Sequence, residues 1–182
     1  MPKLFWFGIL SIPVILASWR SLSSARNHGF YRFFAWEGIL WLAISNWKHW
    51  FEDPLSPKQL LSWLLLLIAT YLVITGIRVF TRTGKISTSR EDKTLFGFEK
   101  TTELIDTGIY RYIRHPLYAS LLYLAWGIFL KNTTPELLIV TLAASVLLYL
   151  TSRFDERECL AYFGNRYRDY MARSRMFIPF IF

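Results

Sequence analysis

The sequence has few of the residues that build disulfides and metal sites. It contains one cysteine, Cys159, and three histidines, His28, His49 and His115, among 182 residues. A single cysteine excludes a disulfide within the chain, and histidines this far apart form no metal-ligand pattern, so we predict no metal site. The sequence also has no G-x-G-x-x-G after a strand, which excludes a Rossmann nucleotide site.

Apolar residues are abundant instead, and they occur in runs. Hydrophobic residues make up 53% of the chain and aromatic residues 18%, more than an ordinary soluble domain of this length contains. A membrane-spanning helix needs about 20 mostly apolar residues, and its backbone must satisfy its own hydrogen bonds. We therefore predict an all-α integral membrane protein with five transmembrane helices. The five runs are Leu4–Trp19, Phe33–Trp47, Leu60–Phe80, Pro116–Leu130 and Leu137–Ser152.

The basic residues are sorted by connection. If the five runs span a membrane, 17 of the 21 Lys and Arg residues lie on one side and four on the other. The positive-inside rule places the richer side in the cytoplasm, with the N-terminus outside and the C-terminal tail inside. A nucleic-acid-binding protein would not show this sorting, so we predict membrane lipids, and no nucleic acid, as partners. We favour an uncleaved first span over a signal peptide, because no A-x-A site precedes Arg20.

We predict one membrane domain over residues 1–182. The tail should form an amphipathic cytoplasmic helix, because Phe163, Tyr167 and Tyr170 fall at i, i+4 and i+7. The expected parts are three N-terminal spans (1–80), a cytoplasmic connection (81–115), a helical hairpin (116–152) and a tail (153–182) that completes the site.

Two polar clusters flank this predicted hairpin. Gly108–Tyr118 precedes it and Arg153–Tyr170 follows it. The two ends of a hairpin meet, so we expect the clusters to touch. From charge alone, a belt of interfacial ion pairs is the simpler interpretation. The contact would place Arg111, Arg114 and His115 opposite Asp155, Glu156 and Glu158.

The spacing within both clusters resembles a known family. GIYRYIRHPLY (Gly108–Tyr118) is similar to the G-x-Y-R-Y-x-R-H-P-x-Y motif of integral-membrane methyltransferases, which include isoprenylcysteine carboxyl methyltransferase and the phospholipid N-methyltransferases. From Asp155 onward the tail resembles their E-E-x-x-L-x-x-x-F-G-x-x-Y-x-x-Y pattern, with Phe-Ile-Pro at 177–179. Asp155 stands where the family usually has Glu, and Cys159 where it has Leu.

The resemblance, over roughly residues 101–182, implies a function. It implies methyl transfer from S-adenosylmethionine to a lipophilic acceptor, a prenylcysteine-like carboxylate or a lipid amine, at the cytoplasmic interface. Catalytic roles would fall on Arg114, which could hold a carboxylate acceptor, and on His115 or Glu156, which could take a proton from an amine. The implied cofactor-binding residues are Tyr110, Arg111, Tyr112, His115, Pro116, Tyr118, Asp155, Glu156, Tyr167 and Tyr170.

Two other functions are compatible with these residues. Membrane reductases of the sterol reductase type use NADPH and carry an R-H-P-x-Y-like motif, although Asn typically follows their proline where this chain has Leu117. A non-catalytic scaffold could use the same basic residues to bind anionic headgroups.

Overall fold

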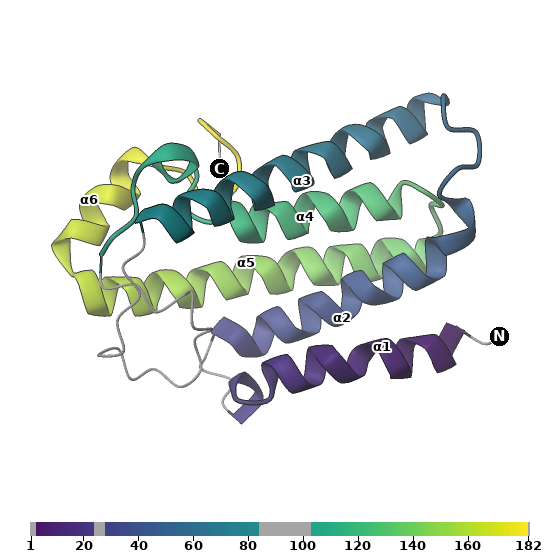
Figure 1. The fold of residues 1–182 in the computed structure, drawn as a ribbon, viewed down its shortest axis with the longest axis horizontal. Helices are drawn as coiled ribbons and strands as arrows, with labels where there is room; N and C mark the ends of the chain where they lie inside the picture. The colour runs from purple at the N-terminus through teal and green to yellow at the C-terminus, as the bar shows by residue number, and fades with distance from the viewer. Residues whose placement is uncertain (1–2, 24–27, 84–102, 182) are drawn as a thin grey trace.

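The protein is a helical bundle, seen here in a computed structural model that describes residues 3–23, 28–83 and 103–181. Five long helices lie side by side, and a short sixth helix crosses one end (Figure 1). These described residues contain no strand, and every predicted apolar run lies on a helix. Most of the expected connection 81–115 falls on residues 84–102, outside the described residues. The helices are α1 (Lys3–Ser18), η1 (Ser21–Ser23), α2 (His28–Asn46), η2 (Trp47–His49), α3 (Pro57–Thr83), η4 (Gly108–Arg111), α4 (Pro116–Phe129), α5 (Pro135–Phe163) and α6 (Asn165–Arg173).

The helices of the bundle differ in length. Among the described residues, α3 and α5 are long and apolar enough to cross a membrane, whereas α1 and α4 are apolar but shorter. At 1.5 Å per residue α4 is about 21 Å long, less than the roughly 30 Å of a hydrocarbon core. Helix length by itself therefore supports two of the five predicted spans. Helix α4 is shorter than its neighbours α3 and α5.

Polar contacts fix the hairpin turn between α4 and α5. Pro135 opens α5, and the side chain of Thr134 accepts a hydrogen bond from the backbone N–H of Leu137. The Lys131 ammonium is buried: its Nζ lies 3.4 Å from the ring centroid of Trp63 and donates to Oε1 of Gln59 at 3.1 Å. Both partners belong to α3, so the turn is held against that helix.

Helices α3 and α4 approach closely at Gly127. A Cβ at this glycine would lie 2.9 Å from side-chain atoms of Leu66. Ser62 Oγ, also on α3, donates to the carbonyl of Gly127 at 2.7 Å, and Asn46 Nδ2 at the end of α2 donates to the carbonyl of Ile128 at 2.7 Å. These bonds join α2, α3 and α4 around one apolar cluster. Its buried members are Ile39, Leu42, Leu66, Ala125, Ile128, Phe129 and Leu137.

Helix α5 continues beyond the predicted end of the hairpin at residue 152. It ends at Phe163, so Asp155, Glu156 and Glu158 lie on its last turns and not in a separate tail. Gly164 then takes a left-handed φ of +60°, a conformation that suits glycine, and α6 begins in a new direction. The prediction of one helical face running through Phe163, Tyr167 and Tyr170 is therefore wrong, because the glycine divides the segment into two helices.

The chain after α6 returns to the residues before α4. Arg175 forms a parallel bridge with Ile113, and the backbone N–H groups of Arg114 and His115 donate to the carbonyls of Arg175 and Met176 at 2.7 and 3.2 Å. Met176 and Phe177 are buried against α3 and α4. These contacts hold the residues that precede α4 in place.

Candidate active site

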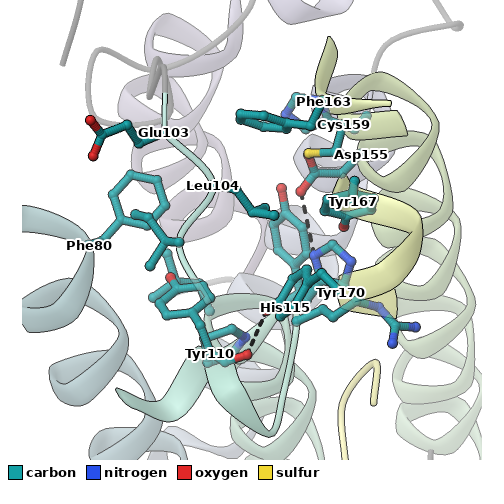
Figure 2. A pocket seen from close by; sticks show the side chains of 16 residues that line it. Phe80, Glu103, Leu104, Tyr110, His115, Asp155, Cys159, Phe163, Tyr167 and Tyr170 are labelled. Atoms are coloured by element: carbon teal, nitrogen blue, oxygen red, sulfur yellow. Dashed lines mark hydrogen bonds and ion pairs between the residues drawn. The ribbon is translucent and has the colours of Figure 1, made fainter. Parts of the chain in front are cut away.

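A cavity of about 120 Å³ opens at the end of the bundle where α3 ends and α4 begins (Figure 2). Its walls come from α2 to α6 and from the connection before α4, so both polar clusters contribute to it. The lining residues are His28, Phe80, Glu103, Leu104, Ile105, Tyr110, Arg114, His115, Pro116, Leu117, Tyr118, Asp155, Cys159, Phe163, Tyr167 and Tyr170.

Arg114 and Glu156 form a buried ion pair beside this cavity. Arg114 Nε donates to Oε1 of Glu156 at 2.8 Å, and only 2% of the Glu156 side chain is exposed. Arg114 Nη1 also donates to the carbonyls of Met171 and Ser174, at 3.2 and 2.6 Å. The guanidinium therefore joins α5 to the end of α6. Glu156 itself does not line the cavity, because its carboxylate faces Arg114.

His115 lies between two carboxylates. Its Nδ1 is 3.5 Å from Oδ2 of Asp155, and its Nε2 is 3.5 Å from Oε1 of Glu156. The ring stacks on Tyr118, and Figure 2 shows it pointing toward Asp155. Burial opposes the charged ring, but the hydrogen bonds and charges of the two carboxylates outweigh burial and raise the pKa of His115. The two carboxylates therefore favour the charged form of His115 at one wall of the cavity.

Four tyrosines line the cavity, and three of them lie apart from the ring of His115 that stacks on Tyr118. Tyr110, Tyr167 and Tyr170 are all buried, and the Tyr170 hydroxyl donates to the backbone carbonyl of Tyr110 at 2.6 Å. Burial raises the pKa of Tyr167 and of Tyr170, so both hydroxyls stay protonated and can donate hydrogen bonds. With Glu103, Asp155, Arg114 and His115, the cavity combines flat apolar faces, two carboxylates and basic groups, a set that suits a zwitterionic ligand carrying a planar ring.

The structure brings together most of the predicted site residues, but not all of them. Tyr110, Arg114, His115, Pro116, Tyr118, Asp155, Tyr167 and Tyr170 line the cavity. Arg111 and Tyr112 do not: Tyr112 is 45% exposed, and Arg111 lies over its ring. They occupy the outer face of the turn that carries Tyr110 and Ile113 inward.

The sequence analysis missed the cavity-lining residues that lie outside the two motifs. His28, at the first position of α2, lines the cavity together with Phe80 from the end of α3 and Leu104 from the connection. His28 lies 87 positions before His115 in the sequence, and only the packing of α2 against α5 reveals that both reach one cavity. Cys159 could have been found, because it follows Asp155 by one helical turn.

Comparisons with known proteins identify relatives of this chain. A family model described as phospholipid methyltransferase matches residues 57–166. The methanethiol S-methyltransferase of Pseudomonas deceptionensis is 28% identical over 123 residues, which are 65% of this chain and 42% of that protein. Methanethiol S-methyltransferase 2 of Bradyrhizobium diazoefficiens is 32% identical over 74 residues, 41% of this chain and 28% of that protein.

The chain spans less than half the length of these curated relatives. No solved structure is significantly similar to it. The matched segment runs from the first residue of α3 into α6, more than half of the chain, and contains Arg114, His115, Asp155 and Glu156. The chain belongs to the phospholipid methyltransferase family.

Proposed function

We propose that the protein is an integral-membrane methyltransferase that uses S-adenosylmethionine to methylate a lipophilic acceptor at the cytoplasmic face of a membrane. The observation that carries the proposal is the meeting of Arg114 and His115, before α4, with Asp155, near the end of α5, at one cavity. Family membership supports methyl transfer, and the apolar helices support a membrane location.

The groups around the cavity match those that S-adenosylmethionine presents. Tyr110 and Tyr167 offer flat surface for an adenine, Asp155 an acceptor for hydroxyl or ammonium groups, and the His115 imidazolium a partner for a carboxylate. When bound, the cofactor would supply a methyl group already activated by a sulfonium. The chain then has to align donor and acceptor and exclude water, which the buried tyrosines favour.

The acceptor class can be narrowed from the relatives. Those relatives are named for methanethiol, a small lipophilic thiol. We therefore place a thiol first among the acceptors, ahead of the prenylcysteine-like carboxylate and the lipid amine that the motif resemblance implies. The cavity adjoins the start of the short, apolar helix α4, and we expect such a molecule to enter it from the lipid.

The first experiment measures cofactor binding by calorimetry on detergent-purified protein. S-adenosylhomocysteine should bind saturably, and NADPH should not. Asp155→Asn should weaken binding by roughly 10- to 150-fold, the equivalent of losing one charge-assisted hydrogen bond of about 1.5–3 kcal/mol. Asp169→Asn makes the same change on an exposed position of α6 and should leave binding unaltered.

The second experiment supplies S-adenosylmethionine with three acceptors: ethanethiol, a prenylated cysteine and phosphatidylethanolamine. Methylation of ethanethiol supports the thiol assignment, whereas methylation of either lipid alone moves the acceptor to that class. Binding of NADPH in place of S-adenosylhomocysteine would assign the protein to the reductases and overturn the proposal.

A further inference from the structure

The cavity has two sides of different chemistry. Asp155 on α5 belongs to the polar side, with Arg114 and His115 from the residues just before α4. Phe80, near the end of α3, and Leu104, in the connection before α4, line the other side. Figure 2 shows Phe80 across the cavity from Asp155. A cavity divided in this way can hold a charged group and a hydrocarbon group next to each other.

The side that carries Phe80 consists mostly of hydrocarbon. Ile105 and Leu117 also line the cavity, and Ile105 is buried. Glu103 lines it as well, but this residue is exposed, and its carboxylate points away from Leu104 in Figure 2. The carboxylate therefore keeps its contact with water. The hydrocarbon side chains offer a surface on which an apolar group can leave water.

Two close approaches hold this apolar side against the start of α4. A Cβ at Gly76, on α3, would lie 3.0 Å from Cδ2 of Leu117. A Cβ at Gly108, in η4, would lie 2.6 Å from Cγ2 of Val79, the neighbour of Phe80. The end of α3 therefore packs directly on η4 and on α4, and the backbone that carries Phe80 is fixed relative to both.

The ring of Phe80 is also packed against η4. Its centroid lies 6.0 Å from that of Tyr110, with 52° between the ring planes. The backbone of Tyr110 is itself held, because the Tyr170 hydroxyl donates to its carbonyl at 2.6 Å. Phe80 has the largest side chain of the hydrocarbon residues on this side. Replacing its ring with a smaller side chain would therefore enlarge the apolar side more than a truncation of its aliphatic neighbours.

We propose that the apolar side holds the hydrocarbon tail of a thiol acceptor and that the Phe80 ring limits the length of this tail; this rests on the proposed methyltransferase function. The tail lies along Leu104 and Leu117 and ends at Phe80, so the sulfur faces the polar side, where the donor binds. The sulfur forms a bond to the methyl carbon as the sulfonium bond to that carbon breaks. The S–H proton passes to solvent, and the products are a methyl thioether and S-adenosylhomocysteine.

The test uses a series of straight-chain thiols: ethanethiol, butanethiol and hexanethiol. Wild type should methylate ethanethiol with the highest kcat/KM, because the longer chains meet the Phe80 ring. Phe80→Ala should raise the ratio of kcat/KM for hexanethiol to that for ethanethiol by about 10- to 200-fold, the discrimination that one methylene in an apolar pocket provides. Each ratio is compared with the wild-type ratio in the same detergent, so differences in thiol solubility cancel.

Ile77 provides the matched control. It lies on the same turn of α3, but 49% of it is exposed and it does not line the cavity. Ile77→Ala removes a hydrocarbon side chain and should leave the ratio at its wild-type value. Phe80→Leu keeps a hydrocarbon of intermediate size and should shift the ratio in the same direction by a smaller factor. This variant keeps the test decisive even if Phe80→Ala does not fold.

Binding of S-adenosylhomocysteine separates an acceptor role of Phe80 from a donor role, and it requires no turnover. Calorimetry should give the same affinity for Phe80→Ala as for wild type, because the proposed contact of this ring is with the acceptor. Binding weakened as much as in Asp155→Asn would overturn the proposal, because Phe80 would then contact the donor.

The remaining outcomes distinguish failure of this proposal from failure of the proposed function. Equal changes for all three thiols in Phe80→Ala would overturn the length limit and leave the methyltransferase proposal standing. A wild-type preference for hexanethiol over ethanethiol would do the same. Wild-type protein that binds S-adenosylhomocysteine but methylates no thiol of the series would overturn the thiol acceptor and with it the role of Phe80. Wild-type protein that does not bind S-adenosylhomocysteine would overturn both proposals.

Discussion

Arg114 and Glu156 show how a buried pair can matter more for stability than for ligand contact. Glu156→Gln leaves the Arg114 guanidinium in the interior with two backbone carbonyls and a neutral amide in place of the carboxylate. Losing one partner of a buried ion pair typically costs about 3–5 kcal/mol. Glu156→Gln should therefore lower the melting temperature strongly in detergent.

Asp169→Asn is the matched control for this change. It removes a carboxylate charge from an exposed position of α6, where substitutions cost about 0.5 kcal/mol or less. If the two variants melted alike, the Arg114–Glu156 pair would have no structural role, and Glu156 would be better placed among the ligand-binding groups.

His115 should make stability depend on pH. Its folded-state pKa is raised because the Asp155 and Glu156 carboxylates outweigh the effect of burial. The stabilisation is therefore complete below the unfolded pKa of about 6.5 and is lost as pH rises through the folded value. Melting temperatures measured from about pH 6 to about pH 9 should fall for wild type. The fall should be much smaller in His115→Gln, and parallel curves would contradict this role.

The contact between α3 and α4 depends on the absence of one side chain. A Cβ at Gly127 would meet Leu66 at 2.9 Å, within a contact that Ser62 also ties. Overpacking costs about 1–3 kcal/mol, whereas alanine gains at most about 1 kcal/mol in helix propensity. Gly127→Ala should therefore destabilise the bundle.

Gly8→Ala controls for helix propensity. Gly8 lies on α1, and a Cβ there would meet nothing within 4 Å. This variant should melt at or slightly above the wild-type temperature, while Gly127→Ala melts below it. Destabilisation of both variants to the same extent would mean that the α3–α4 contact tolerates a methyl group.

The elements that the sequence predicts well are those whose signal is local. Apolar runs locate the helices because a helix that is buried in lipid or protein needs apolar side chains. Pro116 marks the start of α4, as expected. The continuation of α5 to Phe163 was missed, because charged side chains such as Asp155 resemble a solvated tail until their partners are known. The turn at Gly164 needs a left-handed φ that the helical spacing of its neighbours conceals.

The candidate site divides in the same way. Motif spacing predicted the meeting of Arg114 and His115 with the acidic pair, because a hairpin brings its ends together. The same spacing could not show which side chains of the short turn before α4 point toward the cavity. Arg111 was therefore predicted at the cavity but does not line it. The position of His28 at the cavity depends on the packing of α2 against α5, and no local sequence pattern predicts that contact.

At the scale of the whole molecule, the bundle has two chemically different ends. Helix α6 and the start of α4, where the cavity lies, are at one end, and the turn between α4 and α5 is at the other (Figure 1). The parts of α3 and α5 that end near the cavity, and α6 itself, carry most of the described arginines. Because the cavity end carries more basic charge, we expect it to face the cytoplasm, as the positive-inside rule predicts. S-adenosylmethionine would then reach the cavity from the cytoplasm, and the acceptor from the lipid.

The lone cysteine makes this orientation directly measurable. In a Cys159→Ser background, Leu55→Cys places a thiol at an 81% exposed position before α3, and Arg166→Cys places one on exposed α6. A membrane-impermeant maleimide should label the first variant in intact cells and the second only after permeabilisation, because α3 separates the two ends. The Cys159→Ser background alone should stay unlabelled. Labelling of both variants in intact cells would contradict a membrane between the two ends of the bundle. The reversed labelling pattern would place the cavity outside the cell, where S-adenosylmethionine from the cytoplasm could not reach it.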